Sequence, residues 1–207
     1  MKKLFLAVLS AILPFAASAA SDEEILDKIE KANASLPAAQ SHFDHSRFIK
    51  ASGKTINMEG AMYFVPPEKL RMQYTTPATD LVMINANIMY IRRSSDVGNV
   101  FNTDKNQMMA VLRNSLLYSI RGKMRDVARE NDGNITVTEE AKNYVVTVSA
   151  KKKAPRGYSR ITVTFRKSDC LPVVMVMEEF SGTVNTYTMS DIITRKPADS
   201  VFDIPKK

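Results

Sequence analysis

The sequence predicts a mainly β fold with helices, an α+β arrangement in which ten or eleven antiparallel strands dominate. Short runs rich in β-branched, aromatic and Met residues alternate with turn residues, and two further segments have helical periodicity. The 207 residues, 44% hydrophobic and 25% charged, are enough to bury a core. So many strands must either close into a barrel or be covered at the open side by helices. The expected strands are 43–50, 56–65, 69–75, 81–86, 88–92, 134–139, 144–150, 158–167, 172–179 and 183–190, with a short strand or edge anchor at 201–205.

Helices are predicted over about residues 21–36 and 104–122. In the first, Ser21 suits the N-cap position and acidic residues follow it, where they favour the positive end of a helix. In the second, apolar residues recur at spacings of three and four from Asp104, which suits the start, to Gly122, which suits the end. The apolar stripe of the first helix consists of Ile25, Leu26, Ile29 and Ala32.

The first residues have the pattern of a secretory signal peptide. Lys2 and Lys3 precede an apolar run, and Ala17-Ser18-Ala19 provides the small residues that signal peptidase requires. The run of about 14 residues is shorter than the roughly 20 that a membrane-spanning helix needs. We therefore expect residues 1–19 to be removed near Ala19, leaving residues 20–207 as one domain in the periplasm.

Composition argues against most enzyme and metal-binding classes. With one Cys and two His, the chain lacks the Cys pairs and His clusters of zinc and redox sites. His42 and His45, three positions apart at a strand entry, should point to opposite faces, and we expect both to be exposed to solvent. No GxSxG, P-loop or dinucleotide motif occurs. We expect no catalytic residue, no metal, no cofactor, no nucleic-acid partner, and a buried, inert thiol at Cys170.

A basic loop is expected between two of the later strands. It contains Lys151, Lys152, Lys153 and Arg156. Such a loop is either a solvated turn that keeps a sheet edge from pairing, or a contact for an anionic membrane surface or an acidic partner protein.

Several expected strands are apolar on both faces, as in Val173–Met177 and Ile88–Ile91. The second face must then lie under a helix or around a ligand, and ordinary helix-on-sheet packing explains the pattern equally well. The 12 Met residues suit either role, because Met fills irregular core space and also adapts to variable apolar ligands. These residues alone leave both interpretations open.

Four motifs follow one another along the chain. The segment Gly60-Ala61-Met62-Tyr63-Phe64-Val65-Pro66-Pro67-Glu68-Lys69-Leu70-Arg71-Met72-Gln73-Tyr74-Thr75-Thr76-Pro77 comes first, followed by Asn85–Ile91, Glu178–Ile192 and Ser200–Pro205. In this order, after an export signal and a helix, they resemble the LolA-like family of periplasmic carriers of outer-membrane lipoproteins. The resemblance covers essentially the whole mature chain.

The resemblance implies an unclosed antiparallel β-barrel covered by a helical lid, with an apolar cavity for acyl chains between them. The chain departs from the family at Pro66, where well-studied members have an Arg that ties the lid shut. Either Arg71 or another group replaces that contact, or the lid opens differently. The residues expected to line the cavity are Met58, Met62, Phe64, Leu70, Met72, Tyr74, Met83, Met108, Leu112 and Leu116.

The resemblance also implies a function without catalysis. The chain would be a monomeric carrier that receives acylated lipoproteins from an ABC-type exporter of the inner membrane and delivers them to an acceptor in the outer membrane. Transient contact with a membrane surface would accompany the transfer. Two alternatives are a carrier or sensor of another amphiphile, such as a glycolipid or free acyl chain, and an envelope interaction module that binds no lipid.

Overall fold

The computed structural model describes residues 20–93 and 97–205, so the expected signal peptide lies outside the described residues. Eleven strands form one antiparallel sheet in these ranges. The strands are β1 (Ala39–Ile49), β2 (Lys54–Val65), β3 (Lys69–Thr76), β4 (Leu81–Asn85), β5 (Ile88–Arg92), β6 (Asn99–Asn102), β7 (Gly133–Glu139), β8 (Asn143–Ala150), β9 (Tyr158–Arg166), β10 (Pro172–Glu179) and β11 (Val184–Ile193). The helices are α1 (Asp22–Ala34), α2 (Gln107–Ile120) and α3 (Met124–Glu130), with short 3-10 helices η1 (Thr103–Lys105) and η2 (Asp199–Phe202).

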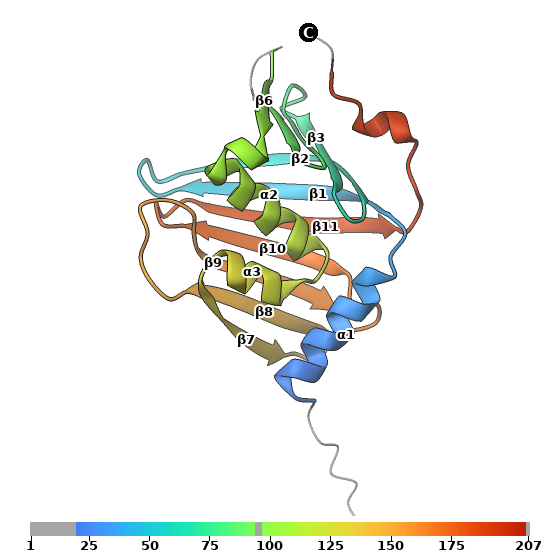
Figure 1. Ribbon diagram of the computed structural model, residues 1–207, viewed down its shortest axis with the longest axis vertical. Coiled ribbons are helices and arrows are strands. Elements are labelled where there is room, and N and C mark those ends of the chain that lie inside the picture. The colour runs from blue at the N-terminus through green and yellow to red at the C-terminus, as the bar shows by residue number, and fades with distance from the viewer. Residues whose placement is uncertain (1–19, 94–96, 206–207) are drawn as a thin grey trace, which may run out of the picture.

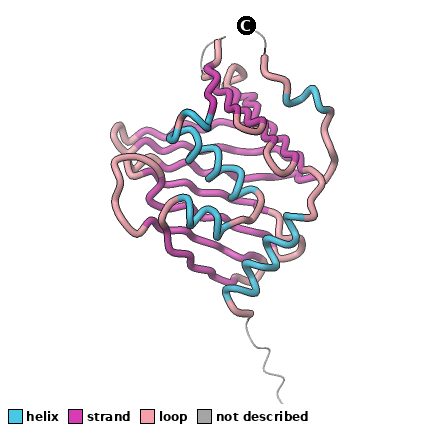
Figure 2. The backbone as a smooth tube through the Cα atoms, in the orientation of Figure 1, coloured by secondary structure: helices cyan, strands magenta, loops and turns pink. Residues whose placement is uncertain are grey.

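The sheet is curved but not closed. Its strand order is β6-β5-β4-β3-β2-β1-β11-β10-β9-β8-β7, so β6 and β7 are the two edges and do not pair with each other. Helices α2 and α3 lie across one face of the sheet, and β3 to β6 are inclined strongly to the strands at the other end (Figures 1 and 2). We call the helix-covered face the inner face and the opposite one the outer face. The predicted α+β fold, an unclosed antiparallel sheet covered by helices, is confirmed.

The cross-strand register determines which side chains face inward. Phe43 of β1 lies opposite Gly60 of β2, and Gly60 lies opposite Tyr74 of β3. Because side chains alternate along a strand, every second residue from these positions also faces inward. The alternation in Leu70, Met72 and Tyr74 is therefore an alternation of burial, and all three are buried in the main core.

Helix α1 begins and packs as its sequence predicts. The Ser21 hydroxyl accepts a hydrogen bond from the Glu24 N–H, and the Glu24 carboxylate accepts one from the Ser21 N–H, which completes a capping box. Three members of the predicted stripe, Ile25, Leu26 and Ile29, are buried in the core.

The helical segment after β6 differs from the prediction. Asp104 belongs to η1, and α2 starts only at Gln107, because the side chain of Asn106 caps it by accepting from the Met109 N–H. The predicted end is correct, since Gly122 has a φ of +67°, a conformation that glycine adopts without strain. Helix α3, which follows at once, was not predicted, because it is too short and too charged to show a clear period.

Three other expectations need correction. Strand β1 starts at Ala39, four residues earlier than predicted, and the short edge strand β6 was not predicted at all. The C-terminal segment forms the 3-10 helix η2 rather than a strand. It does anchor the outer face, because the Arg71 guanidinium donates to the Val201 carbonyl at 2.8 Å.

Cys170 is buried, as predicted. Its carbonyl accepts a hydrogen bond from the side-chain amide of Asn33 in α1, which ties α1 to the turn before β10. Burial raises the pKa of the thiol, which keeps it protonated and unreactive. Within the described residues, no helix has the length and hydropathy needed to cross a membrane.

Candidate functional site

A cavity of about 770 Å³ lies between helix α2 and the inner face of β9, β10 and β11. The loop that joins β8 to β9, residues 151–157, borders it, as do the last turn of α3 and the turn that follows. Its volume falls in the range of about 300–1,000 Å³ that is usual for sites of small ligands. The helix that covers the sheet therefore leaves room beneath its N-terminal half.

The two halves of α2 have different roles. In the first half the apolar side chains are half-buried or exposed and line the cavity, and they are Met108, Met109, Val111 and Leu112. In the second half the side chains pack into the core, where Leu116, Leu117 and Ile120 are buried. The sheet contributes Tyr158, Met177 and Tyr187 to the same cavity. One end of α2 is thus anchored in the core, and the other end presents an adaptable apolar surface.

The mouth of the cavity is rich in positive charge. Six cationic residues contribute to the lining, Arg47, Arg93, Arg129, Lys152, Lys153 and Arg156. Three acidic residues contribute as well, Glu130, Asp132 and Glu179. A positive excess at the rim of an apolar space favours ligands with an apolar part and an anionic part.

The basic loop and the N-terminal end of α2 meet at this mouth. The Arg156 guanidinium lies 3.8 Å from the sulfur of Met108, the nearly half-exposed first apolar residue of α2. Lys152 and Lys153 line the cavity beside Arg156, whereas Lys151 pairs with Asp132 at 3.4 Å. The structure therefore brings together two groups that the sequence analysis treated separately, the covering helix and the basic loop.

The residues expected to line a cavity divide into several groups. Met108 and Leu112 do line it, and Leu116 lies in the core under the same helix. Five others are buried in the main core of the inner face, Met62, Phe64, Leu70, Met72 and Tyr74. Met58 is half-buried and packs against that core. The core is filled at β2 and β3, so the open space lies instead over β9 to β11.

Met83 was expected in the cavity, but it lies on the outer face. Its partners across the strands are Arg71 in β3 and Tyr90 in β5, which both face outward. It forms a small separate cluster with Leu81 and Tyr90, against which Ile204 of the C-terminal segment packs. The two-sided apolar pattern of β4 and β5 thus reflects a chain segment on the outer face.

A buried polar chain crosses the inner face and ends in the cavity. The Tyr74 hydroxyl lies 2.9 Å from Nδ1 of His45, and Nε2 of His45 lies 3.1 Å from Oδ1 of Asn185. Because Oδ1 only accepts, Nε2 carries the proton and Tyr74 donates to Nδ1. The amide of Asn185 then donates to Glu179 at 3.3 Å, and the His45 ring stacks on Tyr187 with centroids 4.1 Å apart.

His45 is therefore not exposed, which corrects the prediction for the two histidines. Only 5% of its surface is accessible, whereas His42 lies half-buried on the outer face. Burial lowers the pKa of His45 to about 4, and the nearby Arg47 and Arg93 act in the same direction. Burial also raises the pKa of Tyr187 to about 12, so both rings are neutral at ordinary pH.

Gly60 makes part of this arrangement possible. It lies between Phe43 and Tyr74, whose rings meet edge to face across it with centroids 5.1 Å apart. A Cβ at residue 60 would lie 2.9 Å from Cζ of Phe43 and 2.2 Å from the Gln73 carbonyl oxygen. A glycine is needed here because of close packing and not because of a positive φ.

Arg113 ties helix α2 to two turns of the sheet. Its guanidinium donates to the Glu68 carboxylate at 2.9 Å and to the Ala86 carbonyl at 2.7 Å, which reaches the turns β2–β3 and β4–β5. Pro66 lies two residues before Glu68, in the same turn. This turn therefore still contacts the helix, but the Arg of the contact, Arg113, belongs to the helix and not to the turn. Arg71, the other candidate for this contact, faces the C-terminal segment.

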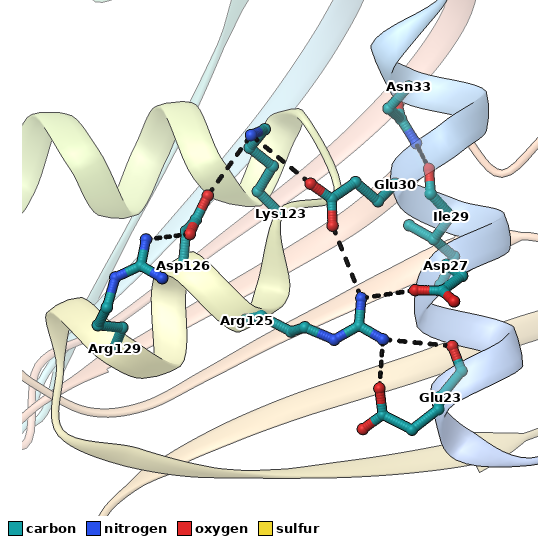
Figure 3. Close-up of polar contacts among 9 residues, drawn as sticks. All are labelled: Glu23, Asp27, Ile29, Glu30, Asn33, Lys123, Arg125, Asp126 and Arg129. Atoms are coloured by element: carbon teal, nitrogen blue, oxygen red, sulfur yellow. Dashed lines mark hydrogen bonds and ion pairs between the residues drawn. The ribbon is translucent and has the colours of Figure 1, made fainter.

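A second set of ion pairs links α3 to α1 (Figure 3). Arg125 reaches three acidic residues of α1, pairing with Glu23, with Asp27 at 2.9 Å and with Glu30 at 3.7 Å. Lys123 lies 3.6 Å from Glu30 and adds a further contact. These pairs join the N-terminal helix to the start of α3, and none of the residues in them lines the cavity.

One group of possible metal ligands lies on the outer face. The ligand atoms of His42, Asp44 and Glu59 lie within 4.8 Å of one another, and all three residues are partly or fully exposed. His45 faces the other side of β1, as the spacing predicts, so the two histidines do not share a site. Exposed acidic groups of this kind are common in proteins without a metal.

The chain thus has an unclosed antiparallel sheet with helices over a partly apolar cavity. The family model described as outer membrane lipoprotein carrier protein LolA matches residues 36–205. The chain therefore belongs to the LolA family, and the resemblance noted in its motifs is confirmed.

Two solved structures are similar to this chain at low sequence identity. A conserved protein from Thermus thermophilus is 12% identical with a TM-score of 0.54, and the match covers 89% of this chain and 94% of that one. A LolA superfamily protein from Nitrosomonas europaea is 13% identical with a TM-score of 0.46, covering 90% of this chain and 99% of that one. No curated protein matches the chain by sequence.

Proposed function

We propose that this chain is a periplasmic carrier that binds the acyl chains of lipoproteins in the cavity beneath α2. It would receive its cargo from an ABC-type exporter of the inner membrane and release it to an acceptor in the outer membrane. Export would depend on cleavage of the N-terminal segment near Ala19, and the mature carrier would act as a monomer. Membership of the LolA family supports the class of function.

The observation that carries the proposal is the apolar space under one half of a helix whose other half is anchored in the core. Each methylene removed from water contributes about 0.8 kcal/mol, so ten methylenes in the cavity contribute roughly 8 kcal/mol. Flexible side chains such as Met108, Met109 and Met177 can adapt to chains of different shape and repack when the chain leaves. Such a cavity holds a lipid without catalysis.

The contacts of α2 suggest how the cavity would open. Arg113 holds the middle of the helix to two turns through one ion pair and one hydrogen bond, which are both weak enough to break reversibly. Leu116, Leu117 and Ile120 keep its C-terminal half in the core. The N-terminal half would therefore move away from the sheet while the C-terminal half stays in place.

A binding titration with a fluorescent triacylated peptide tests the proposal. We expect saturable 1:1 binding by the purified protein, and no binding of the same peptide without acyl chains. Leu112→Glu places a charge in the cavity and should weaken binding by about tenfold or more, because a charge buried among acyl chains is costly.

The matched control is Val176→Glu. Val176 is also half-buried, but it faces outward and lies next to Met177 of the cavity. This variant should fold and bind like the wild type. If the wild-type protein is folded but binds neither the triacylated peptide nor another amphiphile, the carrier function is wrong and a lipid-free interaction module is favoured.

A further inference from the structure

In the described part of the chain, five of the six cations that line the cavity form no ion pair. Of the three acidic residues in the lining, Asp132 pairs with Lys151, which is outside the lining. Glu179 accepts hydrogen bonds from Asn185 and Ser181. Among the lining cations, Arg129 pairs with Asp126 of its own helix. Within residues 20–93 and 97–205, the third acidic residue, Glu130, forms no ion pair, and neither do the lining cations Arg47, Arg93, Lys152, Lys153 and Arg156.

Arg47 is the lining cation that lies within a strand of the sheet. It lies on the inner face of β1 opposite Asn185, whose side chain is already engaged by His45 and Glu179. The Nε atom of Arg47 is buried and has no hydrogen-bond partner within residues 20–93 and 97–205. A buried donor without a partner is unfavourable, so this guanidinium is suited to an acceptor supplied by a ligand.

The basic loop supplies further cations on the same cavity. Lys152, Lys153 and Arg156 line it, and none of them has a carboxylate within 4.0 Å in the described part of the chain. The neighbouring cations Lys151 and Arg160 are paired. Lys151 pairs with Asp132, and Arg160 pairs with Glu178 on the outer face. The unpaired members of the loop are thus those that line the cavity.

We propose that the cavity selects amphiphiles with an anionic head group, which binds Arg47 and the loop cations while the acyl chain lies along α2. This inference rests on the proposed function, because it needs a cavity that accepts an acyl chain. A phosphate or carboxylate accepts two parallel hydrogen bonds from a guanidinium, which makes Arg a strong partner for such groups. Tyr158 and Tyr187 also line the cavity, and burial raises the pKa of both phenols, so they add no negative charge.

Three ligands with the same dodecyl chain but different head groups distinguish binding of an acyl chain from selection of an anionic head group. Dodecyl phosphate has a net negative head group, dodecylphosphocholine a zwitterionic one, and dodecyl maltoside an uncharged one. Isothermal titration below the micellar concentration should give binding about tenfold tighter for dodecyl phosphate than for the other two. Inorganic phosphate at the same concentration should not compete, since it lacks the chain.

The variants Arg47→Gln and Lys152→Gln/Arg156→Gln should each reduce the preference for dodecyl phosphate. Their affinity for dodecyl maltoside should fall less than their affinity for dodecyl phosphate, because an uncharged head group forms weaker hydrogen bonds with these cations, and circular dichroism checks that the variants are folded. Arg160→Gln, on the outer face, is the matched control and should keep the full preference.

Equal affinity for the three ligands would overturn selection by charge and leave the acyl-binding function intact. Competition by inorganic phosphate alone would also overturn it, because the site would then be an anion site without a lipid role. If none of the three ligands binds, the proposed function itself fails.

Discussion

The guanidinium of Arg113 in α2 lies 2.9 Å from the carboxylate of Glu68 in the turn between β2 and β3. Arg113 is largely buried by this contact, with 14% of its side chain exposed, and Glu68 is half-exposed. The pair joins the helix that covers the cavity to the turn between β2 and β3, which does not line the cavity. Its strength should therefore set how often the helix opens.

Arg113→Ala should loosen α2 without unfolding the protein. Loss of one partly exposed ion pair and one hydrogen bond to Ala86 should cost about 1–2 kcal/mol of unfolding free energy. Amide hydrogen exchange across residues 107–120 should become faster, and exchange in the central strands should not. Arg160→Ala, which removes another exposed ion pair, is the control and should leave α2 unchanged. Equal exchange in both variants would show that Arg113 does not restrain the helix.

Arg125→Ala should weaken the attachment of α1 to α3 (Figure 3). Its pairs are largely exposed, so we expect a loss of about 1 kcal/mol. For a chain of this size that corresponds to a fall in the melting temperature of about 3 °C. The difference from wild type should shrink in about 1 M NaCl, because salt screens exposed charges. Arg129→Ala, which removes a pair within α3, should change the melting temperature less, and a salt-independent loss would contradict this explanation.

Gly60→Ala should be strongly destabilising because of packing. The added methyl would lie 2.2 Å from the Gln73 carbonyl oxygen, so the backbone of β3 would have to move. We expect a loss of about 3 kcal/mol in urea unfolding. Gly53→Ala is the comparison, since Gly53 has a φ of +64° but no atom within 4 Å of the added Cβ. This substitution should lower the unfolding free energy by only about 1 kcal/mol. Similar losses for both would argue against close packing at Gly60.

His45 should make the protein less stable in mild acid. Its pKa of about 4 in the folded protein is below the unfolded value of 6.5, so the unfolded chain takes up the proton first as the pH falls. The stabilisation by the neutral ring is complete above the unfolded pKa and is lost progressively from about pH 6.5 to pH 4, by roughly 3 kcal/mol at most.

Urea unfolding across this pH range checks the expectation for His45. His45→Gln should be less stable than wild type at neutral pH, and the difference should narrow toward pH 4. His42→Gln, on the outer face, should follow the wild-type curve. If the two variants have the same pH dependence, His45 is not the group that titrates.

Local patterns predicted the parts of the fold that depend on local interactions. The capping box at Ser21, the end of α2 near Gly122 and the alternation of Leu70, Met72 and Tyr74 are all present in the structure. The predicted face of Met83 was wrong, because the face on which Met83 lies depends on the register of β4 with β3. The turn between these strands sets that register. Helix α3 was missed because seven residues show no clear period.

The candidate site was less predictable, because its members come from distant parts of the chain. His45 is buried by contacts with Tyr74 and Asn185, which are 29 and 140 positions away, so no local pattern marks it. The cavity lies over β9 to β11 because α2 crosses the sheet there, and helix placement is a tertiary property. The basic loop and Met108 were both recognised as candidates, yet only the structure shows that they meet.

Native mass spectrometry of the protein after export and purification from the periplasm tests the carrier function most directly. We expect a 1:1 complex with an acylated species in the wild type and in Val176→Glu, and loss of that species in Leu112→Glu. Protein that lacks ligand after purification should form the same complex when it is mixed with a triacylated peptide. A folded wild-type protein that remains unliganded in both experiments, or that binds equally after Leu112→Glu, would contradict an acyl-binding cavity beneath α2.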